Sequence, residues 1–238
     1  MTNRPSKRQN NEVRDISIIP NFNAYAEGSC LIKFGNTHVI CTASIEDKVP
    51  SWLKGQNKGW VTAEYSMLPR SCTTRVKRDV KGISGRSQEI QRLIGRSLRA
   101  VVDLEKFNGF SATIDCDVIQ ADGGTRTASI TGGFVALYLA VQKLIAEGQL
   151  KENPIKEFVA AISCAISNQA CVVDVDYAED CHADVDINFV MTQSEGLVEV
   201  QGTAEGKTFS KKEYDILYEL AKNGIMQLIE KQKEALNL

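Results

Sequence analysis

The sequence has few histidines and prolines and lacks a long apolar run. Only 2 histidines and 5 prolines occur among 238 residues. The longest apolar run, FVALYLAV at residues 134–141, is too short for a membrane span of roughly 20 residues. The opening MTNRPSKRQNNEVR is polar and lacks the apolar core of a secretion signal. These absences argue against a His-rich zinc site, a collagen-like chain and a membrane protein, and they predict a soluble cytoplasmic protein.

The sequence also lacks a recognisable cysteine framework. Its seven cysteines are odd in number, and no two of them have CxxC spacing. Four of them lie inside apolar or strand-like runs: Cys30, Cys41, Cys116 and Cys164. We therefore expect reduced, buried cysteines that pack as small apolar side chains, rather than disulfides or a zinc site.

The composition is that of one globular unit. The chain has 28 basic and 30 acidic residues, a net charge of −2, and 43% hydrophobic residues. No Pro/Ser-rich linker divides it, so we predict a single domain over residues 1–238. Within it we expect a polar N-terminal arm at 1–14, a first half at 15–147 and a second half at 148–238.

Each half is predicted to contain strands followed by a helix. Two β-rich runs at 29–34 and 37–45 flank Gly35 and Asn36, which is typical of a hairpin. The apolar periodicity predicts helices at 84–104 and 127–147. Ser210 and Glu213 form a capping-box pattern that begins a last helix. The remaining predicted strands are 60–65, 112–120, 158–166, 171–177, 184–192 and 197–202.

Basic residues gather between positions 70 and 99. This stretch has nine basic and only two acidic residues, and its first part has few large apolar side chains. A basic loop on a nearly neutral protein indicates a site for a polyanion such as RNA, although a solvated charged surface is an equal alternative. The candidate RNA-binding residues are Arg70, Arg75, Arg78, Arg92, Arg96 and Arg99, and Lys81 belongs to the same stretch.

Acidic residues gather between positions 174 and 186. Six acids occur there without a Lys or Arg. Asp184, Asp186 and Asn188 alternate along a predicted strand, and Asp180 sits in the turn just before it. Because clustered carboxylates repel one another, they favour a hard cation such as Mg²⁺ or Mn²⁺. A solvated acidic turn is the alternative.

A glycine-bearing loop, DGGTRT at residues 122–127, lies between a predicted strand and a helix. Gly123 and Gly124 allow an anion to approach the backbone, Thr125 supplies a hydroxyl, and Arg126 can grip the anion. The loop is neither a Walker A nor a GxGxxG motif, and alone it could be a simple turn. With the basic and acidic stretches, it indicates a phosphoryl or nucleotidyl transferase.

Longer motifs resemble the ribonuclease PH family over nearly the whole chain. They are KGQ at 54–56, GWVTAEYSMLPR at 59–70, GRSQEIQRLI at 85–94, DCDVIQADGGTRTASITG at 115–132, DYAED at 176–180 and VEVQGTAEG at 198–206. The resemblance implies an α+β, RNase PH-like fold, with mixed sheets packed against helices in two βα halves, as in the second domain of ribosomal protein S5.

The resemblance also implies an activity. Members of this family are phosphorolytic 3′-to-5′ exoribonucleases that use inorganic phosphate to trim the 3′ ends of tRNA precursors and release nucleoside diphosphates. They act with Mg²⁺ as homo-oligomers, typically a hexameric ring built as a trimer of dimers. A non-catalytic RNA-binding ring subunit of a related exonuclease assembly is the alternative, and a metal-dependent hydrolytic nuclease is a third hypothesis.

The family's functional positions carry over to particular residues. Arg86, Gly124, Thr125 and Arg126 match its phosphate-binding positions, and Asp180 and Asp186 match its catalytic and metal-binding carboxylates. Arg70, Arg75 and Arg78 fall in the loop that meets tRNA in similar enzymes. The chain departs from the family at residues 6–8, where Ser-Lys-Arg replaces the usual Asp-Gly-Arg, and at Cys181 and His182, where small polar residues are common.

Overall fold

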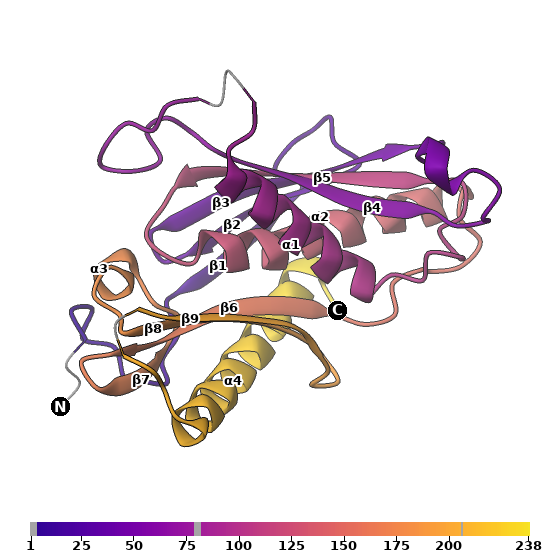
Figure 1. The fold of residues 1–238 in the computed structure, drawn as a ribbon. Coiled ribbons are helices and arrows are strands. Elements are labelled where there is room, and N and C mark those ends of the chain that lie inside the picture. Colours follow the sequence, from indigo (N-terminus) through magenta and orange to yellow (C-terminus); the bar gives the residue numbers. More distant parts are fainter. Residues whose placement is uncertain (1–3, 79–81, 206) are drawn as a thin grey trace.

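The computed structural model describes residues 4–78, 82–205 and 207–238, so Lys81 of the basic stretch and Gly206 at the end of the last family motif lie outside the described residues. The fold is α+β, as predicted, and it has four layers (Figure 1). A five-stranded sheet, a pair of helices, a four-stranded sheet and a C-terminal helix follow one another.

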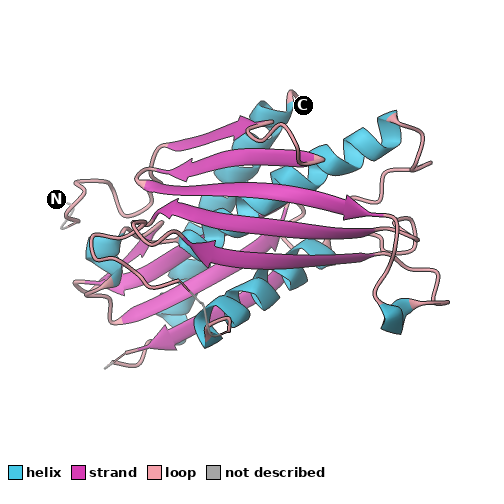
Figure 2. Ribbon diagram, turned by 90° about the horizontal axis from the view of Figure 1, so that it is seen from above, coloured by secondary structure: helices cyan, strands magenta, loops and turns pink. Residues whose placement is uncertain are grey.

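The first sheet is mixed. It contains β1 (Ile16–Pro20), β2 (Gly28–Phe34), β3 (Thr37–Glu46), β4 (Trp60–Met67) and β5 (Ser111–Gln120), in the order β1-β2-β3-β5-β4. Only β4 and β5 pair in parallel. The predicted hairpin is confirmed, because β2 and β3 pair around Gly35, whose φ is +53°. Figure 2 shows this sheet with the helices behind it.

Helices α1 (Gly85–Ala100) and α2 (Thr125–Ala146) cover the inner face of the first sheet. The prediction for α1 extends four residues too far, because Val102 instead forms an isolated bridge with Ile155. By length and composition α2 could cross a membrane, but 72% of its most apolar window is buried inside the protein. It is therefore the central core helix, enclosed by a sheet on each side.

The second sheet contains β6 (Val159–Ser167), β7 (Ala170–Val173), β8 (Val185–Thr192) and β9 (Leu197–Ala204), in the order β7-β6-β8-β9. Helix α4 (Lys211–Leu236) covers its outer face and begins with the predicted capping box of Ser210 and Glu213. The strand predicted to reach residue 177 ends at Val173, because Asp176 instead caps the short helix α3 (Tyr177–Asp180). A 3-10 turn (Ser51–Leu53) precedes β4.

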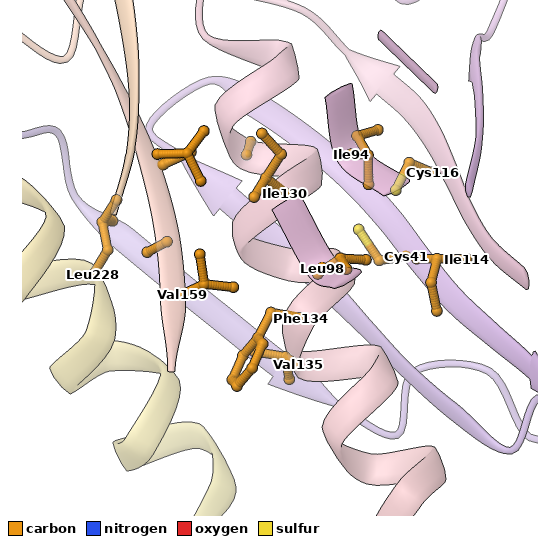
Figure 3. Close-up of a cluster of buried hydrophobic side chains, with 14 of the residues drawn as sticks. Cys41, Ile94, Leu98, Ile114, Cys116, Ile130, Phe134, Val135, Val159 and Leu228 are labelled. Atoms are coloured by element: carbon orange, nitrogen blue, oxygen red, sulfur yellow. The ribbon is translucent and has the colours of Figure 1, made fainter. Parts of the chain in front are cut away.

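The core surrounds α2. Figure 3 shows Ile130 and Phe134 of this helix between the first sheet and α1 on one side and Val159 and Leu228 on the other. Cys41 and Cys116 are register partners on β3 and β5 and are buried with these apolar side chains. All seven cysteines are free, and Cys30, Cys41, Cys116 and Cys164 are buried, as predicted.

The polar N-terminal arm packs against the second half of the chain. Arg4 is only 7% exposed and Arg14 only 8%, so two of the arm's charged side chains are buried. Both bind acids of the second half, Arg4 at Glu179 and Arg14 at Asp174. A buried charge is costly unless it is paired, and these acids supply the pairing.

Candidate active site

One pocket of about 1280 Å³ collects most of the predicted functional residues. It lies where the first turn of α1, the first turn of α2, helix α3 and strand β8 approach one another, with the loop after β4 at its rim. In Figure 1 the start of α2 and helix α3 lie at the same end of the molecule. The predicted residues that line it are Arg70, Arg75, Arg86, Gly124, Thr125, Arg126, Asp180 and Asp186.

The glycine-bearing loop forms the turn into α2. Gly123 and Gly124 have φ values of +74° and +67°, in the left-handed region that favours glycine. A Cβ on Gly123 would lie 2.6 Å from the carbonyl oxygen of Val175, so this position has no room for a side chain. The turn aims the start of a 22-residue helix at the pocket. Its first-turn N–H groups and positive dipole end suit an anion.

Thr37 on β3 and Tyr65 on β4 hold this loop and the start of α2 by hydrogen bonds. The Thr37 hydroxyl donates to the carbonyl of Gly123 at 2.6 Å and accepts from the backbone N–H of Asp122 at 2.9 Å. The hydroxyls of Tyr65 and Thr125 form a hydrogen bond of 2.9 Å. The first sheet therefore determines where the start of α2 lies.

Arg126 uses one nitrogen of its guanidinium to bind Glu89, and a second, buried nitrogen has no partner among the described residues. Its Nη2 donates to Oε2 of Glu89 at 2.8 Å, and the other oxygen of Glu89 accepts from Nε2 of Gln201 at 2.9 Å. Its Nε is buried and has no hydrogen-bond partner among the described residues. Because a buried donor without a partner is costly, this nitrogen suits an anionic ligand in the pocket. Arg86 adds an exposed second guanidinium on the first turn of α1.

Asp180 and Asp186 are the pocket's central carboxylates. Burial and the charge of Asp180 raise the pKa of Asp186 to about 6, although Arg126 and Arg86 oppose the rise. Burial also raises the pKa of Asp180, against the opposing charges of Arg86 and Arg126, and Glu205 adds to the rise. Each carboxylate is thus destabilised as an anion, and a cation between them would relieve this.

The donor set is compatible with Mg²⁺ rather than with an all-protein metal cage. No group of three or more metal-ligating His, Cys, Asp or Glu side chains is found in the described part of the chain. Mg²⁺ characteristically binds one or two carboxylates and completes its shell with water and substrate phosphate oxygens. Asp180 and Asp186 beside an anion pocket provide that arrangement.

The rest of the acidic stretch has a different role from the one we predicted. Asp174 binds Arg14 with an Oδ1–Nη2 distance of 2.6 Å, and Glu179 binds Arg4. Asp184 does not line the pocket, whereas Asp186 and Asn188 do. Arginines of the N-terminal arm, far away in the sequence, therefore neutralise part of the cluster, and only Asp180 and Asp186 remain as candidate metal ligands.

The structure divides the candidate RNA-binding arginines. Arg70 and Arg75 lie at the pocket, while Arg78 and Arg92 are exposed outside its lining. Arg96 binds both carboxylate oxygens of Glu199, at 2.6 and 3.0 Å. Arg99 stacks over Trp60, 4.4 Å from the ring centre, and donates to the carbonyl of Val61. Arg96 and Arg99 are therefore engaged in contacts within the fold.

Sequence reasoning missed three residues of the site. Tyr177 is 61% exposed and lines the pocket beside Asp180. Ser163 lines it from β6, only 3% exposed, and its hydroxyl has no partner among the described residues. Glu89 holds Arg126. The DYAED motif contains Tyr177, but nothing in the apolar run around Ser163 marks it.

Comparison with known proteins agrees with this geometry. The model of the 3′ exoribonuclease family, domain 1, matches residues 12–142, and that of domain 2 of the same family matches residues 157–224. The first match contains the start of α1 and the glycine-bearing loop, and the second contains Asp180 and Asp186. The two matched regions thus meet at the pocket.

Three solved structures are similar in fold. The crystal structure of rice (Oryza sativa) Rrp46 has a TM-score of 0.80 at 16% identity, and the match covers 98% of this chain and 100% of that one. An Archaeoglobus fulgidus exosome with RNA bound to the active site gives 0.81 at 24%, covering 96% and 92%. An archaeal exosome core gives 0.75 at 23%, covering 95% and 89%. At these identities the likeness shows that the fold is shared.

Proposed function

Because the chain belongs to the 3′ exoribonuclease family, we propose that it shortens RNA from the 3′ end by phosphorolysis. One observation carries this proposal: Asp180, Asp186, Arg86, Arg126 and the glycine-bearing start of α2 line the same pocket. An anion site beside a pair of carboxylates is what attack by phosphate on a phosphodiester needs. A hydrolytic nuclease would leave the anion site without a use.

In the proposed reaction, an oxygen of inorganic phosphate bonds to the phosphorus of the last phosphodiester. The bond from that phosphorus to the 3′ oxygen of the preceding nucleotide breaks. The last nucleotide leaves as a nucleoside diphosphate, and the 3′ oxygen takes up a proton. The chain's main task is to bring two anions together, which requires fixed positive charge.

The pocket residues divide this task. Arg126, Arg86 and the backbone N–H groups around Thr125 bind the attacking phosphate and offset its charge. Asp180 and Asp186 would hold Mg²⁺, which would supply positive charge to the scissile phosphoryl group. In the state in which Asp186 alone holds the cation, Asp180, whose pKa burial raises, is our candidate for the proton that the leaving 3′ oxygen takes up.

RNA would enter along the rim of the pocket. Arg70 and Arg75 supply positive charge there, and the exposed ring of Tyr177 offers a surface on which a base can stack. We propose tRNA precursor 3′ ends as the substrate and a hexameric ring as the assembly, on the strength of the family resemblance. Seven free cysteines fit the reducing cytoplasm.

A second candidate is a non-catalytic RNA-binding ring subunit. The names of the similar structures, Rrp46 and two exosomes, favour this assembly context. The presence of Asp180, Asp186, Arg86 and Arg126 in one pocket favours catalysis. A catalytic subunit within a ring satisfies both observations.

Product analysis tests these alternatives. A tRNA with a short 3′ extension and an unstructured RNA oligonucleotide are each incubated with the protein and Mg²⁺, with and without inorganic phosphate. Asp186→Ala is compared with Asp184→Ala, which removes a nearby acid that does not line the pocket. Diphosphates that need phosphate and are absent only with Asp186→Ala support the proposal.

Two other outcomes overturn the proposal. Monophosphates released without phosphate indicate a hydrolase. RNA binding without any release indicates the non-catalytic subunit. Preference for the tRNA over the oligonucleotide tests the substrate separately from the chemistry.

A further inference from the structure

The N-terminal arm carries three arginines that contact the segment leading into α3. Arg8 and Arg14 bind Asp174 before α3, and Arg4 and Arg8 bind Glu179 within α3. The backbone N–H of Val173 on β7 donates to the carbonyl of Asn10 at 3.0 Å, and Arg4 donates to the carbonyls of Val173 and Asp174 at 3.0 and 3.2 Å. An arm with so many contacts to one segment positions that segment.

Arg14 differs from the other two because it also reaches the glycine-bearing loop. Its Nη2 and Nε donate to the carboxylate of Asp174 at 2.6 and 3.0 Å, and its backbone N–H donates there at 2.7 Å. Its Nη1 donates to the backbone carbonyl of Asp122 at 2.6 Å. One guanidinium therefore joins the segment before α3 to the loop before α2.

The two joined segments carry the two halves of the candidate site. The loop after Asp122 leads into the anion site at Thr125, and the segment after Asp174 leads into Asp180. They also touch directly, because the backbone N–H of Tyr177 donates to Oδ1 of Asp122 at 3.3 Å. Asp174 has a φ of +53°, a strained backbone for a residue other than glycine, and its contacts with Arg14 hold it there.

We propose that Arg14 is a positioning residue that sets the phosphate-binding loop against the segment carrying Asp180. The proposal rests on the function proposed above and adds a residue outside the set that contacts the reactants. A planar guanidinium with several donors can fix two segments at once, which a lysine cannot do. Small displacements of a binding group are costly in catalysis, so this link should control phosphate binding.

Thr37 is a second anchor of the same loop that does not bind the acidic segment. It is fully buried and holds both Asp122 and Gly123 by hydrogen bonds from β3. Its Oγ1 lies 3.5 Å from Nη1 of Arg14, so the two side chains act on the loop from adjacent positions. A Thr37→Val variant would remove both hydrogen bonds to the loop and the 3.5 Å contact with Arg14, but it would leave the contacts of Arg14 with Asp174 in place.

The test compares Arg14→Gln with Arg8→Gln. Arg8 is the matched control, since it contacts Asp174, Asp176 and Glu179 but forms no hydrogen bond to the loop. Both variants remove one positive charge from the same acidic cluster. Inorganic phosphate binding is measured by calorimetry on the full chain without RNA, and the KM values for phosphate and RNA are measured separately where turnover occurs.

We expect Arg14→Gln to weaken phosphate binding by roughly tenfold or more, with little change in the KM for RNA. Arg8→Gln should stay within roughly twofold of the unchanged protein. Arg14→Lys keeps the positive charge but loses the several donors of the planar guanidinium. Its phosphate affinity should lie between those of Arg14→Gln and Arg8→Gln. A merely structural role would instead change phosphate binding, RNA binding and Tm together.

Equal effects of Arg14→Gln and Arg8→Gln would overturn the proposal, as would unchanged phosphate binding in Arg14→Gln. If Arg14→Gln does not fold, Arg14→Lys decides, because weaker phosphate binding at retained Tm is then expected and unchanged affinity overturns the proposal. A protein that binds phosphate but releases no diphosphate contradicts the proposed function and leaves this comparison intact. A protein that binds no phosphate overturns both.

Discussion

Arg126 and Glu89 form an ion pair of 2.8 Å that joins the start of α2 to α1. The pair leaves Nε of Arg126 buried and without a partner among the described residues. The ion pair therefore orients the arginine, and Nε can still donate to a ligand. This is the arrangement expected of a binding arginine, since a fully paired one would have to break a contact to bind a ligand.

Replacement of Arg126 should therefore act on phosphate more than on RNA. For Arg126→Gln we expect the KM for phosphate to rise by roughly 10²-fold while the KM for RNA changes only severalfold, because Arg70 and Arg75 at the pocket would still offer positive charge to the RNA. Steady-state kinetics with each substrate varied in turn measures both. Arg96→Gln, which breaks an ion pair with Glu199 outside the pocket, is the control. A larger loss for RNA than for phosphate would contradict the assignment.

The left-handed turn at Gly123 should also be essential to the anion site. In Gly123→Ala the new Cβ would meet backbone atoms of Val175 and Asp176, so the loop must move. Gly109→Ala is the matched control, since its φ is +88° but nothing lies within 4 Å of the added Cβ. Both should lose about 1 kcal/mol of unfolding free energy through backbone strain, and Gly123→Ala should lose more because its Cβ meets backbone atoms. Only Gly123→Ala should also lose phosphate affinity by calorimetry; equal affinity in both would argue against the loop as the anion site.

The elements found from the sequence are those with local signals. The hairpin at Gly35, the helix after Ser84 and the capping box at Ser210 each follow from residues a few positions apart, and the structure confirms them. The glycine-bearing loop was found in the same way, because two glycines before an apolar helix constrain the local backbone.

The relationships that were missed join distant parts of the chain. Arg14 and Asp174 are 160 residues apart, and Arg4 and Glu179 are 175 apart, so no spacing rule connects them. Helix α3 has only four residues, too few to show a helical period. The sequence predicts that the arginines of α1 bind RNA. It cannot show that Arg96 contacts Glu199 and that Arg99 contacts Trp60, because these partners lie far away along the chain.

If Asp180 donates the proton to the leaving 3′ oxygen, Asp180→Asn should reduce kcat by roughly 10²–10⁴-fold and remove one limb of the pH–rate profile. Asparagine keeps the shape of the side chain but has no proton to donate in this range. An RNA with a sulfur in place of the scissile 3′ oxygen sharpens the test, because a thiolate leaves without protonation and the defect should shrink. A pH–rate profile of unchanged shape at a reduced rate would rule out the acid role.

The raised pKa of Asp186 predicts a pH-dependent cost to the fold. Burial and the charge of Asp180 favour the neutral carboxyl, so the stability it contributes is fully present below its ordinary pKa of about 4 and is lost as pH rises through about 6. Asp186→Asn stays neutral and keeps this contribution. In a chelator, its Tm should exceed that of the unchanged protein at about pH 7.5 by roughly 2–4 °C, which corresponds to about 1 kcal/mol after solvent screening. The difference should shrink towards about pH 4.5. Asp184→Asn controls for the loss of one charge, and a Tm difference that does not vary with pH would contradict the burial of Asp186 as its cause.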